Sequence, residues 1–132
     1  VAQSFVEFRR GELDALPIGD REVDAAFANM VWHHLPDFGA AAAEVFRVLR
    51  PGGVAVVSDL LPHDLEWLRT AMGDARLGLR PELVVAALAR AGFTALHTST
   101  ALDRCRVEPH GGEVHELPMF LVRAQKPLEA NS

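Results

Sequence analysis

The stretch from residue 23 to residue 57 limits the fold of this chain more than any other, because it has the pattern of one strand-helix-strand unit. Residues 23–31 are mostly small and apolar, which is typical of a central parallel strand covered on both faces. A helical pattern follows at residues 39–49, and a second aliphatic strand at residues 54–60. Parallel strands need a crossover of this kind. We therefore predict an α/β fold built on parallel strands.

The helix predicted at residues 39–49 is amphipathic. Glu44 and Arg47 fall on the side expected to face solvent. The turn formed by Pro51, Gly52 and Gly53 is expected to end the helix. Apolar side chains fall at helical spacing on the other side of the helix: Ala42, Val45, Phe46 and Leu49.

Polar side chains gather where the two aliphatic strands end. Asn29, His33 and His34 follow the first strand, and Asp59 and His63 follow the second. Parallel strands end at the same edge of a sheet, and open parallel sheets bind ligands at that edge. These residues are therefore our candidates for a ligand site.

The rest of the chain completes a partial doubly wound sheet. The last two predicted strands are joined without a helix, so we expect them to be antiparallel. The prediction is one domain with a mostly parallel sheet, about five strands and three helices. The other predicted elements are a strand at residues 4–10, a helix capped by Asp64, a helix from Pro81 to Gly92, and strands at residues 94–102 and 117–125.

Composition excludes several classes of protein. The chain has 132 residues, which suits one domain but is short for a complete doubly wound fold. A formal net charge of −5 argues against a nucleic-acid partner held through phosphate contacts. No apolar run approaches the roughly 18 residues of a membrane span, and nothing resembles a signal peptide. Because Cys105 is the single cysteine, we expect a cytoplasmic protein without disulfides.

Four motifs, in order along the chain, carry a resemblance to a known family. They are GELDALP at residues 11–17, VDAAFANMVWHHL at residues 23–35, EVFRVLRPGG at residues 44–53, and SDLLPHDLEWLRTAMGDARLGL at residues 58–79. With these motifs the chain resembles the second half of the class I S-adenosylmethionine-dependent methyltransferases, which have a Rossmann-like fold. The last motif is similar to that of methyltransferases fused behind an ArsR-type winged-helix regulator.

The resemblance implies methyl transfer to a small-molecule acceptor, with S-adenosylmethionine as the cofactor. It implies that Glu12 accepts a hydrogen bond from the adenine amino group and that Leu13 covers the adenine ring. It also implies that Asn29 and Met30 line the cofactor pocket. A solvated loop carboxylate at Glu12, and an Asn29 amide that only satisfies loop backbone groups, are the structural alternatives.

One part of the family pattern is missing from this chain. The family has a glycine-rich loop after its first strand, and here no two glycines are separated by a single residue. We therefore expect residues 1–132 to form the C-terminal portion of the methyltransferase fold, without the first strand-loop unit. A truncated or incomplete enzyme would bind the cofactor weakly or not at all.

His33 and His34 are the candidate catalytic bases. A neutral imidazole can accept a proton near pH 7, although either histidine could instead cap the helix that follows. Asp59 and His63 are candidates for the substrate side of the same crevice. Trp32 is expected to pack in the core, where aromatic surface is usually buried.

A non-catalytic remnant is the alternative function. Strands missing from the sheet would leave unpaired backbone groups at its edge, which folded proteins rarely tolerate. We therefore expect one of two arrangements. Either the strand around Val6 pairs with the strand around Phe27, or a homodimer completes the sheet, with or without exchange of a segment.

A metal-dependent hydrolase is a third alternative. Polar residues near the last turn are of types that zinc accepts, but their spacing gives no fixed geometry, and a solvated hairpin explains them as well. We predict no metal site there. The residues considered are His110, Glu113, His115 and Glu116.

Overall fold

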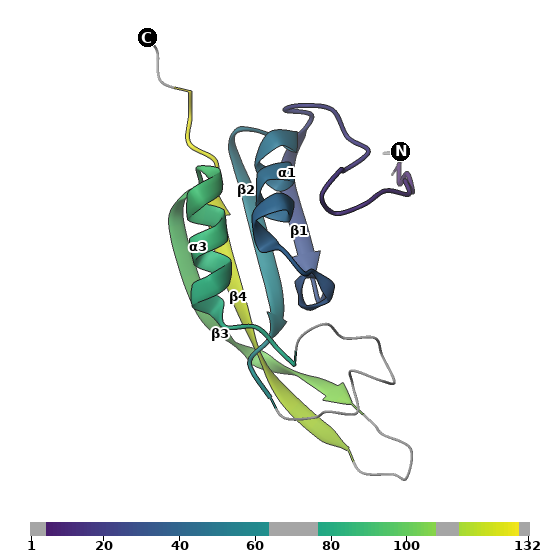
Figure 1. Cartoon of the computed structure of the whole chain (residues 1–132), viewed down its shortest axis with the longest axis vertical. Coiled ribbons are helices and arrows are strands. Elements are labelled where there is room, and N and C mark those ends of the chain that lie inside the picture. The colour runs from purple at the N-terminus through teal and green to yellow at the C-terminus, as the bar shows by residue number, and fades with distance from the viewer. Residues whose placement is uncertain (1–4, 64–76, 108–113, 130–132) are drawn as a thin grey trace, which may run out of the picture.

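The computed structural model describes residues 5–63, 77–107 and 114–129. In this part of the chain, two α-helices lie side by side over one face of a four-stranded sheet (Figure 1). The helices are α1 (Phe38–Val48) and α3 (Pro81–Ala91), and a short 3₁₀ turn, η1, spans Trp32–His34. The strands are β1 (Val23–Asn29), β2 (Leu49–Leu60), β3 (Thr94–Val107) and β4 (His115–Gln125).

The sheet is mixed, with strand order β1-β2-β4-β3, and of the strand pairs in the described residues only β1–β2 is parallel, so the prediction of a mostly parallel sheet is wrong for them. β1 and β2 are parallel and are connected through η1 and α1, which confirms the predicted strand-helix-strand unit. β4 is antiparallel to both β2 and β3, which confirms the prediction for the last two strands. The predicted count of strands and helices is not matched in the described residues, and the helix capped by Asp64 lies outside them.

Two predictions about the N-terminal part of the chain are wrong. Residues 5–10 form no strand, and Phe5, Val6 and Phe8 are 87%, 77% and 93% exposed. Among the described residues, β1 is an edge strand instead of a central one, and its Phe27 is 76% exposed. Alternation and small apolar residues indicate that a segment can form a strand, but its neighbours depend on tertiary packing.

The core lies between the two helices and one face of the sheet. Along β2, Ala55 and Val57 are buried on this face, while Val54 and Val56 on the opposite face are half-buried. Trp32 is 1% exposed and stacks on Phe38 at 5.5 Å between ring centroids, so its predicted packing role is confirmed. The largest fully buried side chains of this core also include Leu49, Val84, Leu88, Phe120 and Val122.

Both helices have end residues with clear physical roles. Asp37 caps α1 by accepting a hydrogen bond from the Gly39 N–H at 2.8 Å. Pro81 opens α3, and Gly92 ends it with a φ of 116°, as predicted. α1 ends at Val48, before the predicted Pro-Gly-Gly stop, because Leu49 already has an extended backbone. In the described residues, no helix has the length and apolar character that a bilayer crossing requires.

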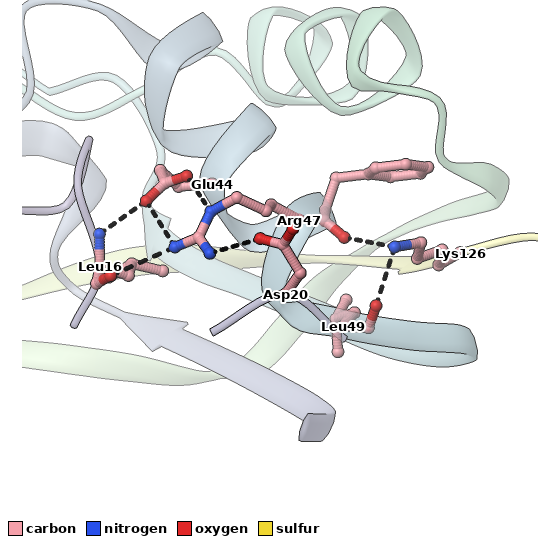
Figure 2. Close-up of polar contacts among 7 residues, drawn as sticks. Leu16, Asp20, Glu44, Arg47, Leu49 and Lys126 are labelled. Atoms are coloured by element: carbon pink, nitrogen blue, oxygen red, sulfur yellow. Dashed lines mark hydrogen bonds and ion pairs between the residues drawn. The ribbon is translucent and has the colours of Figure 1, made fainter. Parts of the chain in front are cut away.

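Lys126 stabilises the C-terminal end of α1. Its Nζ donates hydrogen bonds to the carbonyl oxygens of Phe46 and Leu49, both at 2.8 Å (Figure 2). The ammonium also lies 4.4 Å from the centroid of the Phe46 ring. The residue is only 8% exposed, so the bonds replace the water that a buried ammonium loses. Its positive charge is well placed at the negative end of the helix dipole.

We expect Lys126→Met to lower the free energy of unfolding by about 2 kcal/mol, because two carbonyl groups lose a charged donor. Urea denaturation followed by circular dichroism measures this change. Arg50→Met is a matched control, since the exposed Arg50–Asp24 pair should contribute less than about 1 kcal/mol. Equal effects of the two substitutions would contradict the capping role.

Candidate functional site

The chain makes a tight and strained turn at the carboxyl end of β1. Met30 has a φ of 59°, a left-handed conformation that costs a non-glycine residue roughly 1 kcal/mol or more. Two bonds to Ser58 of β2 hold this turn. The Met30 N–H donates to the Ser58 carbonyl at 2.9 Å, and the Ser58 hydroxyl donates to the Asn29 Oδ1 at 2.6 Å. Asn29 itself is exposed, so its amide is available at the end of the sheet where ligands bind.

A buried carboxylate joins the next turn to the end of β2. Asp59 is fully buried and accepts the backbone N–H of His33 at 3.0 Å and that of Leu60 at 2.7 Å. The His33 Nδ1 lies 2.9 Å from the Asp59 Oδ1. An ionised carboxylate can only accept, so the His33 ring hydrogen sits on Nδ1 and a neutral ring keeps Nε2 as an acceptor. Asp59 thus fixes both the backbone and the ring of His33.

The two histidines differ in their access to solvent. The His33 side chain is 7% exposed, whereas His34 is an exposed residue. Their rings lie 4.0 Å apart between centroids, so the anchored ring of His33 supports that of His34. A molecule approaching from solvent therefore meets His34 first.

The predicted site residues at the ends of β1 and β2 divide between the two faces of the sheet. The strand register pairs Asn29 with Ser58, and successive side chains of a strand point to opposite faces. Asp59 and His33 consequently lie on the face covered by the helices, while Asn29 lies on the other. His63 follows β2 and donates its backbone N–H to the Leu77 carbonyl at 3.2 Å.

Residues 11–17, the 11–17 loop, cover an apolar hollow beside β1. Glu12 is exposed at the tip of a turn in which the Ala15 N–H donates to the Glu12 carbonyl at 3.1 Å. Leu13 is half-buried and lines the hollow, whose volume is about 260 Å³. The remaining lining is almost wholly apolar and includes Leu16, Ile18, Ala26, Ala28, Trp32, Ala41 and Val45.

Two charged residues of α1 hold the 11–17 loop in place (Figure 2). The Glu44 Oε1 accepts the Leu16 N–H at 2.7 Å, and the Arg47 Nη2 donates to the Leu16 carbonyl at 3.2 Å. Arg47 also donates to Glu44 at 2.6 and 2.9 Å and to Asp20 at 2.8 Å. Glu44 and Arg47 were predicted to face solvent, and this prediction is wrong. Their spacing showed which side of the helix they occupy, but not that a loop distant in sequence packs there.

These contacts shift the proton affinity of both side chains. The hydrogen bond from Arg47 is the main cause that lowers the pKa of Glu44, and the Leu16 N–H adds to the effect, while burial opposes it. The hydrogen bonds to Glu44, and then to Asp20, raise the pKa of Arg47 above its usual range. The pair is therefore charged at neutral pH.

Sequence and structure comparisons connect this architecture with known proteins. Residues 1–57 match a family model described as a methyltransferase domain. Over 99 residues the chain is 33% identical to phthiotriol/phenolphthiotriol dimycocerosates methyltransferase 1 of Mycobacterium ulcerans, an alignment that covers 74% of this chain and 36% of that protein. Over 65 residues it is 35% identical to the malonyl-[acyl-carrier protein] O-methyltransferase of Yersinia pestis, covering 49% of this chain and 24% of that protein.

The structural likeness extends over nearly the whole chain. A SAM-dependent methyltransferase from Methanosarcina mazei superposes with a TM-score of 0.66 and 20% identity, covering 93% of this chain and 68% of that one. The fold is thus the α/β fold of S-adenosylmethionine-dependent methyltransferases. The family match and the sequence relatives support the same family for this chain. The matched segments span 24–36% of the length of the first three curated relatives.

We expect Asp59→Asn to lower the free energy of unfolding by about 1–3 kcal/mol, because an amide cannot accept from all three N–H donors that face the carboxylate. Asp24→Asn is the control, because Asp24 is exposed and its ion pair with Arg50 should contribute less than about 1 kcal/mol. Urea titration at pH 7 measures both variants. An Asp59→Asn protein as stable as the wild type would show that the carboxylate does not hold the turn.

The Glu44 contribution to stability should disappear in acid. Its folded pKa is lowered, so the contribution is complete above the unfolded value of about 4.3 and is lost as the pH falls through the folded value. We expect the stability difference between wild type and Glu44→Gln to be constant from pH 7 to about 5 and to shrink below about pH 4. Urea denaturation at several pH values measures this difference, and an unchanged difference at pH 3 would contradict the assignment.

Proposed function

We propose that this chain takes part in S-adenosylmethionine-dependent methyl transfer to a small-molecule acceptor, and that it supplies the adenine side and the acceptor side of the site. The observation that carries the proposal is the anchored 11–17 loop, with Leu13 over an apolar hollow, in the part of the chain that matches the methyltransferase domain. The names of the relatives, which include a fatty-acid O-methyltransferase, support methyl transfer in general.

The residues of the proposed cofactor site fit an adenine ring. Leu13 presents an apolar surface beside the hollow, and Glu12, exposed next to it, has a carboxylate that could accept from an exocyclic amino group. Asn29 and Met30 are not in the lining of the hollow, so they would meet a part of the cofactor that lies outside it, at the end of β1. When bound, the cofactor supplies a methyl group on a positively charged sulfur. The chain has no glycine pair separated by one residue, so we expect these residues to hold only part of the cofactor.

On the acceptor side, the chain offers a supported imidazole. We propose that His34 accepts the proton that an attacking nucleophile loses, because it is exposed and its ring packs beside a ring that Asp59 fixes. His33 then acts through His34, and Asp59 and His63 shape the acceptor side. One base contributes about 10²–10⁴-fold to a rate, whereas orientation of the reactants can contribute 10⁵-fold or more in effective concentration. Positioning by the loop and the turns should therefore matter more than the histidines.

A non-catalytic interaction domain is the second candidate function. It is favoured by β1, which in the described residues forms an edge of the sheet with Phe27 exposed. An edge strand without Pro or Lys can pair with another chain, and a homodimer through β1 would satisfy it. The cytoplasmic location, the likeness to ArsR-fused enzymes and the C-terminal place of residues 1–132 in a longer fold remain predictions.

We expect S-adenosylhomocysteine to bind this chain with a Kd of about 100 μM or weaker, since affinity falls tenfold for each 1.4 kcal/mol of lost contacts. Isothermal titration calorimetry measures the binding. Leu13→Asp should abolish the signal, because it places a charge against an apolar ring face. Leu128→Asp is the control, since Leu128 is exposed and lies outside the lining of the hollow.

The two candidate functions give different results in this experiment. A wild-type chain that gives no heat and sediments as a stable dimer would support the interaction domain and overturn the proposed methyl transfer. Binding that Leu13→Asp removes and Leu128→Asp preserves would support the cofactor site.

A further inference from the structure

The strongest unexplained feature of the molecule is the way in which α1 holds one residue of the 11–17 loop. Glu44 and Arg47 bind both backbone polar groups of Leu16, the N–H at 2.7 Å and the carbonyl at 3.2 Å. A backbone with both groups bound can neither rotate nor slide without breaking a bond. The same two side chains are joined to one another by two further hydrogen bonds at 2.6 and 2.9 Å.

The Arg47 guanidinium suits this arrangement because its donors lie in one rigid plane. It binds Glu44 through two nitrogens and still reaches the Leu16 carbonyl and the Asp20 carboxylate (Figure 2). The Glu44 side chain is 15% exposed and that of Arg47 is 33% exposed, so water competes only partly for these bonds. Asp20 follows the 11–17 loop in the sequence, so Arg47 contacts the loop itself at Leu16 and the chain just after it at Asp20.

The tip of the loop is connected directly to Leu16. The Ala15 N–H donates to the Glu12 carbonyl at 3.1 Å, which closes the tip into a turn directly before Leu16. Leu13 and Leu16 both line the apolar hollow, so they pack against the same surface. The turn and the shared packing surface thus connect the positions of Glu12 and Leu13 with that of Leu16.

We propose that Glu44 and Arg47 are positioning residues of the cofactor site, which hold the 11–17 loop so that Glu12 and Leu13 meet the adenine. This inference rests on the proposed function. Neither residue is in the lining of the hollow: Glu44 acts on the Leu16 N–H, and Arg47 acts on the Leu16 carbonyl and keeps Glu44 in place. The loop that would bind the adenine is thereby coupled to the helix between β1 and β2.

Four substitutions test the roles of Glu44 and Arg47 separately. Glu44→Ala removes the acceptor of the Leu16 N–H, whereas Glu44→Gln keeps an oxygen at the same place. Arg47→Met removes every donor, and Arg47→Lys keeps the charge but loses the planar fork. Arg50→Met is the matched control, because it deletes an arginine from an exposed ion pair with Asp24 outside the loop.

We expect Glu44→Ala and Arg47→Met to raise the Kd for S-adenosylhomocysteine about tenfold or more, and Arg47→Lys to restore little of the loss. Glu44→Gln and Arg50→Met should stay within about threefold of the wild type. Calorimetry on the full chain measures the Kd, and circular dichroism at the same temperature verifies that each variant is folded. If Glu44→Gln binds S-adenosylhomocysteine nearly as tightly as the wild type while Glu44→Ala does not, general destabilisation cannot explain the loss in Glu44→Ala.

Amide hydrogen exchange tests the loop itself without a ligand. The Leu16 amide should exchange faster in Glu44→Ala than in Glu44→Gln, while the amides of α3 keep their rates. Two results would overturn the positioning role alone. One is an exchange rate of the Leu16 amide that is unchanged in Glu44→Ala, and the other is a Kd that stays within about threefold of the wild type in both Glu44→Ala and Arg47→Met. A wild-type chain that binds no S-adenosylhomocysteine overturns the proposed function, and the positioning role with it.

Discussion

The parallel pairing of β1 with β2 is the constraint on which the rest of the structure depends. It places the ends of both strands at the same edge of the sheet, and it requires a crossover, which η1 and α1 provide. The crossover brings His33 to Asp59 at one end of the unit. It also gives α1 an outer side, where Glu44 and Arg47 receive the 11–17 loop. The candidate site is therefore assembled around one supersecondary unit.

Buried polar side chains secure this unit at both of its ends. Asp59 satisfies backbone N–H groups where β2 ends, and Lys126 satisfies carbonyl groups where α1 ends. Each is a charged group whose burial is tolerated because several hydrogen bonds replace its water. The apolar core alone would leave these groups of the backbone unpaired. Packing determines where the helices lie on the sheet, and these two residues determine how the chain enters and leaves α1.

The features that the sequence predicted well are local. Pro81 and Gly92 bound α3 because their backbone preferences act on neighbouring residues, and the helical spacing of α1 needs no information from elsewhere. The same holds for the polar residues after each strand. The failures concern partners distant in sequence. The alternation at Val6 and Phe8 was real, yet no strand forms there, and Glu44 looked like a surface residue until Leu16 was placed beside it. The sequence also gave no sign that Lys126 reaches α1, because 77 or more residues separate it from both carbonyl groups that it binds.

Lys126 has a consequence for solution chemistry, because it is the only lysine of the chain. Its amine is buried and bound to two carbonyl oxygens in the folded protein, so a reagent that acylates amines can modify this side chain only when the corner between α1 and β4 opens. The rate of that acylation, followed by mass spectrometry, would report the opening of this corner separately from global unfolding. A single natural side chain thus serves as a built-in reporter, with no label introduced.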